Sequence, residues 1–313
     1  MTDIVSKFNG IDSRFQTISN NISELELEIA EKQDKEETLY FTDSKIFKRC
    51  GLAWKDKNNL YESWPNGGVQ ADGNDIIIIY NSRYSHVDRT LSSDIIMRKK
   101  CELDDWDEKK IILQHDGTNS YANPSWCILN NGDYFMVCYV ETAETLTPQK
   151  FPFKMFKSTD KGETWSDLGF VKVNNEIITD ECMMTLFCTS TGKLISFVGG
   201  TNNLKFVASD DNGQTWRFVG DAFTKALEAT FYEATTGHIY AILRSQNSNP
   251  YFIKLNAQLT EYEILYSGNT FKFPVVWNPV GLKTYKDKIV IIGGSRTPDR
   301  TGRYVLYETI TTE

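Results

Sequence analysis

The feature that most constrains the fold of this chain is a repeat of two apolar strands around a tight turn. The repeat occurs five times, at Trp64–Arg83, Asn123–Tyr139, Glu181–Gly200, Glu228–Arg244 and Asn278–Arg296. Short apolar runs separated by Gly, Asn and Asp are typical of strands, and no long helical pattern follows Leu39. A strand repeat of about 50 residues predicts the four-stranded blades of a β-propeller, in which the inner strands are the most apolar.

Two other segments, Ser158–Trp165 and Ser209–Trp216, share the pattern S-x-D-x-G-x-T-W. The pattern resembles the Asp-box of sialidase-type β-propellers, a structural hairpin turn between the outer strands of a blade. In such a turn the carboxylate accepts backbone N–H bonds, Gly adopts positive φ and Trp packs under the blade. The structural residues expected from the resemblance are Ser158, Asp160, Gly162, Trp165, Ser209, Asp211, Gly213 and Trp216. Degenerate copies are expected at Arg98–Trp106 and Lys254–Glu261.

The number of blades is left between five and six. Five repeats favour five blades, whereas the sialidases that the Asp-boxes resemble have six, and a sixth blade could lie within Leu39–Tyr61. We interpret Tyr40–Trp54 instead as a strand that closes the ring against the last blade. The expected fold class is therefore all-β, with the propeller over residues 39–313.

A heptad repeat of apolar residues runs through the start of the chain. Its members are Ile4, Phe8, Ile11, Phe15, Ile18, Ile22, Leu25 and Ile29. So narrow a stripe is typical of a coiled coil, and isoleucine at both a and d positions favours three or more strands over two. The alternative is one amphipathic helix packed on the domain. We predict that residues 1–38 form an α-helical coiled-coil stem through which the protein trimerises.

Composition excludes several classes of partner. The net charge is −8 and no basic run occurs, so binding to nucleic acid is not expected. Neither a membrane span nor a signal-peptide pattern is present in the sequence. The cysteines lack C-x-x-C pairing, and we expect buried free thiols made in a reducing compartment. With 3 histidines, neither a metal site nor a cofactor is expected.

The fourth repeat resembles the sialidase segment E-x4-E-x3-G-x6-R, at Glu228, Glu233, Gly237 and Arg244. The resemblance implies that Glu228 would polarise a tyrosine nucleophile. It also implies that Arg244 would be one of three arginines that bind the substrate carboxylate, a task for which a guanidinium is well shaped. If the protein is an enzyme, Arg296 could be a second such arginine, and Asp88 or Asp94 the acid/base.

The rest of the sialidase constellation is missing from the sequence. The position of the first arginine reads Glu62-Ser63-Trp64-Pro65, and that of the tyrosine reads Trp277-Asn278-Pro279. Without a nucleophile and a clamp arginine the usual reaction is not expected, since both act on the transition state. We therefore predict that the protein is not an active sialidase, with a glycosidase of atypical mechanism as an alternative.

A trimeric stem with a non-catalytic propeller resembles the receptor-binding proteins of bacteriophage tails. The resemblance implies a virion protein made in the host cytoplasm, which binds a host-surface glycan such as a cell-wall glycopolymer and contacts other tail or baseplate proteins. The glycan-binding candidates are Trp64, Arg83, His86, Trp126, Arg244, Trp277 and Arg296. Each tryptophan could instead fill the core, and each cation could be an ordinary strand-end charge. A structural adaptor that docks other tail proteins is a further alternative.

Overall fold

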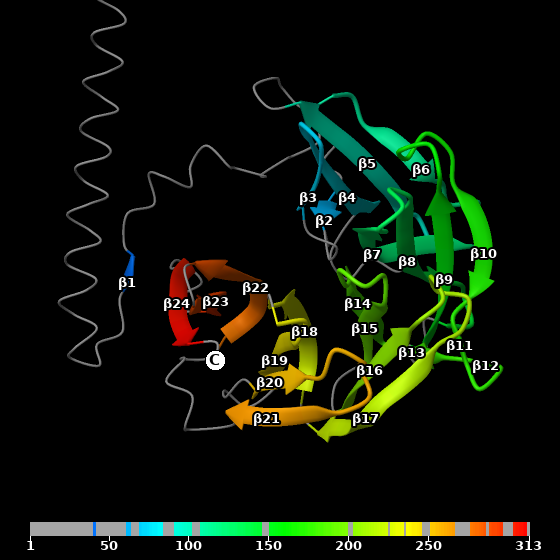
Figure 1. Ribbon diagram of the computed structural model, residues 1–313. Coiled ribbons are helices and arrows are strands. Elements are labelled where there is room, and N and C mark those ends of the chain that lie inside the picture. The colour runs from blue at the N-terminus through cyan, green and yellow to red at the C-terminus, as the bar shows by residue number, and fades with distance from the viewer. Residues whose placement is uncertain are drawn as a thin grey trace, which may run out of the picture. The chain divides into compact units, whose positions relative to one another are not determined.

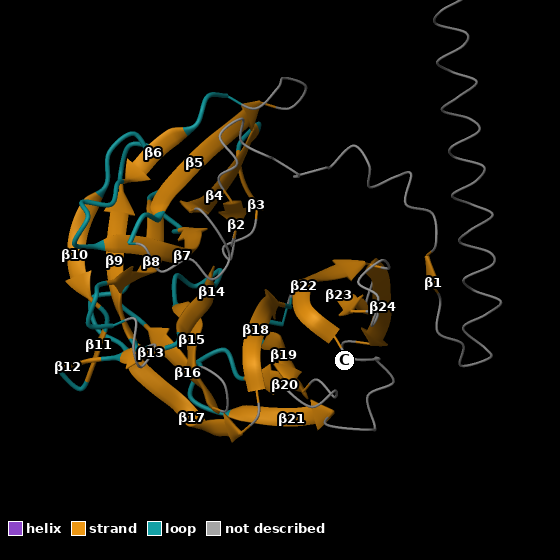
Figure 2. Ribbon diagram, turned by 180° about the vertical axis from the view of Figure 1, so that it is seen from behind, coloured by secondary structure: helices purple, strands orange, loops and turns teal. Residues whose placement is uncertain are grey.

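The structure is a computed structural model, and the description covers residues 40–41, 61–63, 69–83, 91–101, 107–145, 150–199, 203–224, 226–234, 236–245, 251–266, 276–285, 288–296 and 303–311. The chain divides into two compact units, Met1–Tyr40 and Phe41–Glu313. The described residues form strands and loops, without a helix among them (Figure 2). The predicted stem, with all eight heptad residues, lies outside the described residues.

Four antiparallel sheets follow one another along the chain and form a propeller-like arrangement (Figure 1). In blade one, β2 (Tyr61–Ser63) and β3 (Val69–Asp72) both pair with β4 (Asp75–Arg83), followed by β5 (Asp94–Cys101) and β6 (Lys110–Leu113). Blade two contains β7 (Ser120–Ile128), β8 (Tyr134–Glu141), β9 (Phe151–Ser158) and β10 (Ser166–Phe170). Blade three contains β14 (Cys182–Cys188), β15 (Leu194–Gly199), β16 (Asn203–Ser209) and β17 (Arg217–Thr224). Blade four contains β18 (Ala226–Glu233), β19 (Ile239–Ser245), β20 (Tyr251–Leu255) and β21 (Tyr262–Tyr266).

A further sheet is described by its backbone alone. It contains β22 (Val276–Tyr285), β23 (Lys288–Arg296) and β24 (Arg303–Thr311), in the order β1-β24-β23-β22, where β1 is Tyr40–Phe41. The sheets whose side chains are described thus give four blades, which differs from the five or six expected from the sequence. The difference arises because the side chains of the fifth repeat lie outside the described residues.

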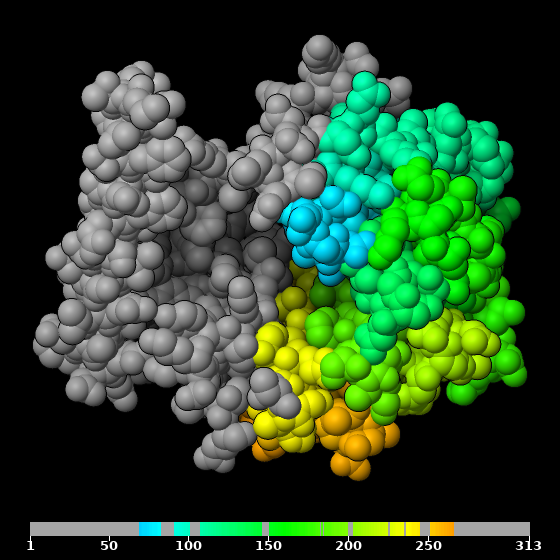
Figure 3. All heavy atoms as spheres, turned by 45° about the horizontal axis from the view of Figure 1, so that its top comes forward, coloured from blue at the N-terminus to red at the C-terminus, as the bar shows by residue number. Residues whose placement is uncertain are grey.

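The five predicted repeats are confirmed as antiparallel hairpins. Each repeat forms the inner part of a sheet, with β3 pairing β4, β7 pairing β8, β14 pairing β15, β18 pairing β19 and β22 pairing β23. Every residue of β8 and of β15 is buried, as the apolar composition of these strands predicts. In the space-filling view, the described residues of blades one to four, drawn in colour, pack into one continuous body (Figure 3).

The hydrophobic core lies between neighbouring blades. One cluster joins Ile79 and Met97 of blade one to Trp126 and Met136 of blade two. A second joins blades two and three, and a third joins blades three and four. Because blades two and three each share a core cluster with the blade on either side, β8 and β15 are buried along their whole length instead of at alternate residues.

Both Asp-boxes form the predicted turns between the outer strands, β9–β10 and β16–β17. Asp160 Oδ1 accepts a hydrogen bond from the Thr164 backbone N–H at 2.8 Å, and Oδ2 accepts one from the Thr164 hydroxyl at 2.6 Å. Asp211 makes the same two bonds with Thr215 at 2.9 and 2.6 Å. The bonds from Thr164 hold the pKa of Asp160 well below its usual range.

Each Asp-box also packs against the preceding blade. Gly162 lies against Met97 of blade one, and Gly213 lies against the Phe135 ring of blade two. Both glycines have positive φ, +84° and +85°, so neither the backbone nor the space accommodates a side chain. The glycine that both copies share therefore serves the packing between blades as well as the turn itself.

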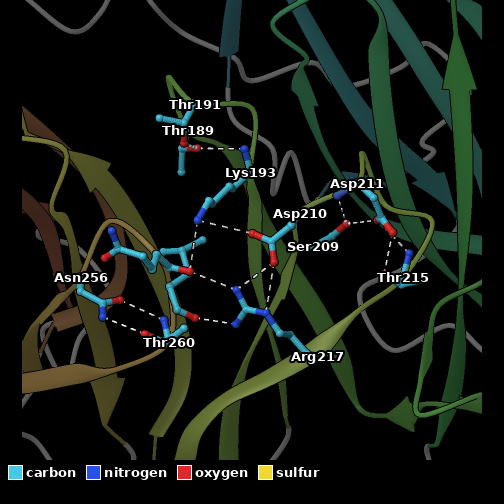
Figure 4. Close-up of polar contacts among 12 residues, drawn as sticks. Thr189, Thr191, Lys193, Ser209, Asp210, Asp211, Thr215, Arg217, Asn256 and Thr260 are labelled. Atoms are coloured by element: carbon cyan, nitrogen blue, oxygen red, sulfur yellow. Dashed lines mark hydrogen bonds and ion pairs between the residues drawn. The ribbon is translucent and has the colours of Figure 1, made fainter.

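The outer turn of blade four, between β20 and β21, is a degenerate Asp-box with asparagine in the place of aspartate. Asn256 Oδ1 accepts the Thr260 N–H at 2.9 Å, and Asn256 Nδ2 donates to the Thr260 hydroxyl at 2.8 Å. Arg217, directly after the second Asp-box, donates to the carbonyls of Leu259 and Gln258 at 2.6 and 3.1 Å (Figure 4). The expected copy within Lys254–Glu261 is thus confirmed. Most of the copy expected at Arg98–Trp106 lies outside the described residues.

The link between blades two and three carries a small hairpin that the sequence did not predict. It consists of β11 (Lys172–Val173) and β12 (Glu176–Ile177), followed by β13 (Thr179–Asp180), which pairs with β9. Asn174 and Asn175 form its turn with φ of +52° and +67°. Asparagine at both central positions suits a turn that requires two positive φ values.

Candidate functional site

The candidate site lies at the end of the blades where the innermost strands begin and the second strands finish, which we call the site end. Asn81, Arg244, Asn123 and Glu228 all lie towards this end of their strands. The hairpin turns and the Asp-boxes lie at the opposite end, which we call the turn end. The topology therefore separates the structural turns from the polar residues expected to bind ligand.

The innermost strands β7, β14, β18 and β22 are each interrupted by a β-bulge. In β7 the bulge holds Asn123 and Pro124, and Asn123 has φ of +50°. In β14 it holds Thr185 with φ of +59°, an uncommon conformation for a β-branched residue. Bulges and strained residues redirect side chains and occur often beside binding sites. The sequence gives no alternation signal that locates them.

Glu228 and Arg244 form an ion pair across the first two strands of blade four. The residues are directly opposite in the β18–β19 register, and Arg244 Nη1 lies 2.9 Å from Glu228 Oε1. Their side chains are 15% and 18% exposed for Arg244 and Glu228 respectively, so the pair is largely withdrawn from water. Glu228 Oε2 is buried and has no hydrogen-bond partner in the described structure. The structure thus brings together the two residues that the sialidase-like spacing predicted.

Glu233, the second glutamate of that spacing, has a structural role. Its carboxylate accepts hydrogen bonds from the backbone and side chain of Ser190 at 2.6 and 2.7 Å. Ser190 belongs to the β14–β15 turn of blade three, so Glu233 ties two blades together at the turn end. Only Glu228 and Arg244 of the segment therefore remain as site residues at the site end.

A buried polar group lies between blades one and two. The Ser93 N–H donates to Ser120 Oγ at 2.9 Å, and Ser120 Oγ lies 3.1 Å from Glu141 Oε2. The Asn123 N–H donates to Asn81 Oδ1 at 3.3 Å. The signal that could have located the group is the sequence of polar residues after an apolar strand, as in Ile79-Tyr80-Asn81-Ser82.

Asp94, an acid/base candidate, is held by a histidine at the outer part of the site end. Its Oδ1 lies 2.7 Å from both the backbone nitrogen and Nδ1 of His115. The pair resembles the base-and-orienting-group arrangement used in catalysis, but no third member is described beside it. Asp88, the other candidate, lies outside the described residues.

The expectation that Trp126 stacks on a sugar is wrong. Trp126 is fully buried in the cluster between blades one and two, with its ring centroid 5.4 Å from that of Tyr134. A ring without exposed surface offers no face to a ligand, so Trp126 fills the core. Trp64 and His86 lie outside the described residues, and for Arg83, Trp277 and Arg296 the backbone alone is described.

The described cysteines are free thiols. Cys127 and Cys138 are buried and Cys188 is partly exposed, so the expected burial is confirmed for the first two. Burial raises the pKa of the Cys138 thiol well above its usual value. Within the described ranges, no group of three or more His, Cys, Asp or Glu residues could hold a metal ion. None of the described segments forms a helix that could span a membrane.

Comparison with known proteins identifies the fold. No protein-family model matches the chain, and no curated protein matches it. A protein of unknown function from Dyadobacter fermentans superimposes with a TM-score of 0.61 at 14% identity, over 80% of this chain and 79% of that one. The intramolecular trans-sialidase from Ruminococcus gnavus, in complex with oseltamivir carboxylate, gives 0.55 at 14% identity, over 80% and 85%.

A further similar structure is the Hadza microbial sialidase Hz136, with a TM-score of 0.57 at 14% identity. The match covers 80% of this chain and 59% of that one, so the chain spans less than two thirds of that sialidase. At such identities the likeness shows the fold alone. The chain has a sialidase-like β-propeller fold.

Proposed function

We propose that this protein is a receptor-binding or tail-fibre protein of a bacteriophage virion. Its propeller head binds a host-surface glycan, such as a cell-wall glycopolymer, without cleaving it. A stem of residues 1–38 joins three copies and contacts other tail or baseplate proteins. The support comes from the heptad repeat in the sequence, from the sialidase-like fold and from the Glu228–Arg244 pair at the site end of blade four.

The observation that carries the non-catalytic part is the composition of β22. In a sialidase this strand would supply the tyrosine nucleophile at its start, where this chain has Trp277, Asn278 and Pro279. The strand's tyrosine, Tyr285, pairs with Lys288 at the turn end, opposite to the site. Glu228 consequently has no tyrosine on that strand to polarise, whereas Glu228 and Arg244 can still bind a ligand.

The proposed propeller has five blades, with six as the alternative. Support for five comes from the fifth sequence repeat and from the sheet of β22, β23 and β24, which pairs in the same order as the four preceding sheets. A ring of this kind places the site ends of all blades on one face. Three heads on a common stem would raise the avidity of weak glycan sites by about 10²–10⁴ without new contacts.

The test is capture of the intact protein on host cell walls, together with its mass in solution by light scattering. We expect a trimer that binds walls and loses binding when the glycopolymer is removed chemically. A monomer would refute the stem. Binding that persists on glycan-free walls would refute glycan recognition. Stable association with baseplate proteins, without binding to any wall, would identify the protein as a structural adaptor.

A glycosidase of atypical mechanism is the second candidate, because the Glu228–Arg244 pair is retained. A guanidinium beside a partly buried carboxylate is an arrangement that can bind and act on a sugar acid. This candidate predicts slow release of reducing sugar from a sialoside or wall polysaccharide, abolished by Glu228→Gln. The receptor-binding proposal predicts that neither the unmodified protein nor Glu228→Gln releases reducing sugar from these substrates.

A further inference from the structure

The ends of β7 and β14 bring two cysteines of neighbouring blades together at the turn end. Cys127 is the last residue but one of β7 in blade two, and Cys188 is the last residue of β14 in blade three. Cys127 belongs to the hydrophobic core cluster between these blades, and the partly buried Cys188 packs against the same cluster. The two thiols therefore share one interface, although they are far apart in the sequence.

A hydrogen bond before the cysteines sets the register of the two strands. Ser125 Oγ accepts the Leu186 N–H, a contact between residues 61 positions apart in the chain. Each cysteine lies two residues after its member of that contact, so Cys127 and Cys188 are separated by the same 61 positions. Both strands begin at the site end and run in the same direction, and equal spacing along them places the cysteines side by side.

A second set of hydrogen bonds joins the same segments after the cysteines. Asn130 Nδ2 donates to the Ser190 carbonyl at 2.8 Å, and Asn130 Oδ1 lies 3.7 Å from Cys188 Sγ. The thiol of Cys127 also donates a hydrogen bond to the sulfur of Cys188. Contacts between the blades thus bracket the pair on both sides, so neither strand can slide and separate the thiols.

The two thiols differ in reactivity. Cys127 is 4% exposed, and burial raises the pKa of its thiol. The hydrogen bond from Cys127 lowers the pKa of Cys188, which is partly exposed at the end of its strand. Because the thiolate is the nucleophile, Cys188 is the thiol that reacts with a small molecule from solution. Cys127 is then the neighbour that completes the exchange.

We propose that Cys127 and Cys188 form a reversible disulfide that fastens blade two to blade three when the protein meets a small-molecule disulfide such as oxidised glutathione. The Cys188 thiolate attacks one sulfur of the oxidant, whose S–S bond breaks and releases one glutathione. The Cys127 thiol then loses its proton and attacks the Cys188 sulfur, which releases the second glutathione. Two protein thiols are oxidised, one disulfide is reduced, and the two thiol protons pass to the released glutathione. The inference goes beyond the proposed function and does not depend on it.

The first test is disulfide mapping in the intact, folded protein. The reduced protein is incubated with oxidised glutathione at mildly alkaline pH, the remaining thiols are blocked with N-ethylmaleimide, and the peptides are identified by mass spectrometry. We expect a Cys127–Cys188 disulfide that dithiothreitol reverses, with Cys138 still reduced because it is 0% exposed. Protein unfolded in guanidinium chloride before the same treatment should lose this preference, because the fold is what holds the thiols together.

Single variants separate the roles of the two thiols. Cys127→Ala removes the thiol that completes the exchange, so Cys188 should accumulate one bound glutathione. Cys188→Ala removes the thiol that attacks first, so Cys127 should stay reduced. Cys138→Ala removes a buried thiol from the core cluster between blades one and two, and this matched control should form the crosslink as the unmodified protein does.

Thermal unfolding tests whether the crosslink fastens the blades. The oxidised protein should melt roughly 4–16 °C above the same protein treated with dithiothreitol, because the disulfide closes a long loop in the unfolded chain. Cys188→Ala carried through both treatments should show no such rise.

Several outcomes would overturn the inference. They are two thiols that stay reduced, a glutathione adduct of Cys188 that persists in the unmodified protein, pairing of either residue with another cysteine, and the same pairing preference in unfolded protein. A crosslink that leaves the melting temperature unchanged or lower would also overturn it, since the disulfide would then not fasten the blades. None of these measurements involves wall binding, whose failure would refute the proposed function alone.

Discussion

Substitution of Gly213 by alanine tests whether the Asp-box glycine is needed for packing between blades in addition to its backbone conformation. A Cβ at Gly213 would overlap the ring of Phe135, with Cε2 at 2.8 Å and Cε1 at 3.3 Å. Phe135 is fully buried, so its ring cannot move into solvent. Gly169 provides a matched control, because its φ of +87° is nearly the same as the +85° of Gly213 and nothing lies within 4 Å of its Cβ position.

Both variants lose stability through the backbone conformation, and Gly213→Ala alone also loses stability through overpacking. Alanine at positive φ costs roughly 1–2 kcal/mol at either position. Overpacking against Phe135 adds about 1–3 kcal/mol for Gly213→Ala alone. Since 1 kcal/mol shifts the melting temperature of a domain of this size by ~2–4 °C, Gly213→Ala should melt roughly 2–12 °C below Gly169→Ala.

The assay is thermal unfolding followed by circular dichroism at one scan rate for all proteins. Adding Phe135→Leu to Gly213→Ala should recover part of the loss, because the shorter side chain leaves room for the new methyl group. Equal melting temperatures for Gly213→Ala and Gly169→Ala would refute the packing argument. So would a double variant whose losses simply add.

Three further outcomes follow from described contacts. The bonds from Thr164 lower the pKa of Asp160 in the folded protein, so they stabilise the fold above the unfolded pKa, and this stabilisation is lost as pH falls through the folded pKa. Asp160→Asn should therefore show a smaller fall in melting temperature below about pH 4 than the unmodified protein. Parallel plots of melting temperature against pH for the two proteins would contradict this. Arg217→Ala removes two bonds to the outer turn of blade four and should speed amide hydrogen exchange within residues 256–261, with exchange in blade two as the unchanged reference. Glu228→Gln breaks a largely buried ion pair and should lower the melting temperature by a few degrees; an unchanged value would show that the pair does not stabilise blade four.

Much of the fold was predictable because it depends on local patterns. The five strand-turn-strand repeats and both Asp-boxes are each encoded by a short continuous segment of the sequence, and each forms the expected element. The turn chemistry of Asp160 and Asp211 follows from the spacing of Asp and Thr alone. The hairpin of β11 and β12 was missed, since strands of two residues are too short to produce a periodic signal.

The site was less predictable because it depends on neighbours distant in sequence. Glu228 and Arg244 were found together since they are paired across one hairpin, whose register the turn fixes. The sequence left Trp126 open between stacking on a sugar and filling the core, and the ring fills the core between blades one and two, a contact that only the packing of two blades decides. Asn81 and Asn123 come together through the contact between blades one and two. The sequence pattern within either strand does not predict this contact.

The direction of the Asp-box contacts has a consequence for synthesis of the chain on the ribosome. The outer turn of blade two packs against Met97 of blade one, and the outer turn of blade three packs against Phe135 of blade two. Blades two and three thus each contact a blade that is synthesised earlier. A newly emerged blade can therefore dock at once on a surface that is already folded. Assembly of these blades can keep pace with translation from the N-terminal side, which shortens the time during which apolar strand faces are exposed to aggregation.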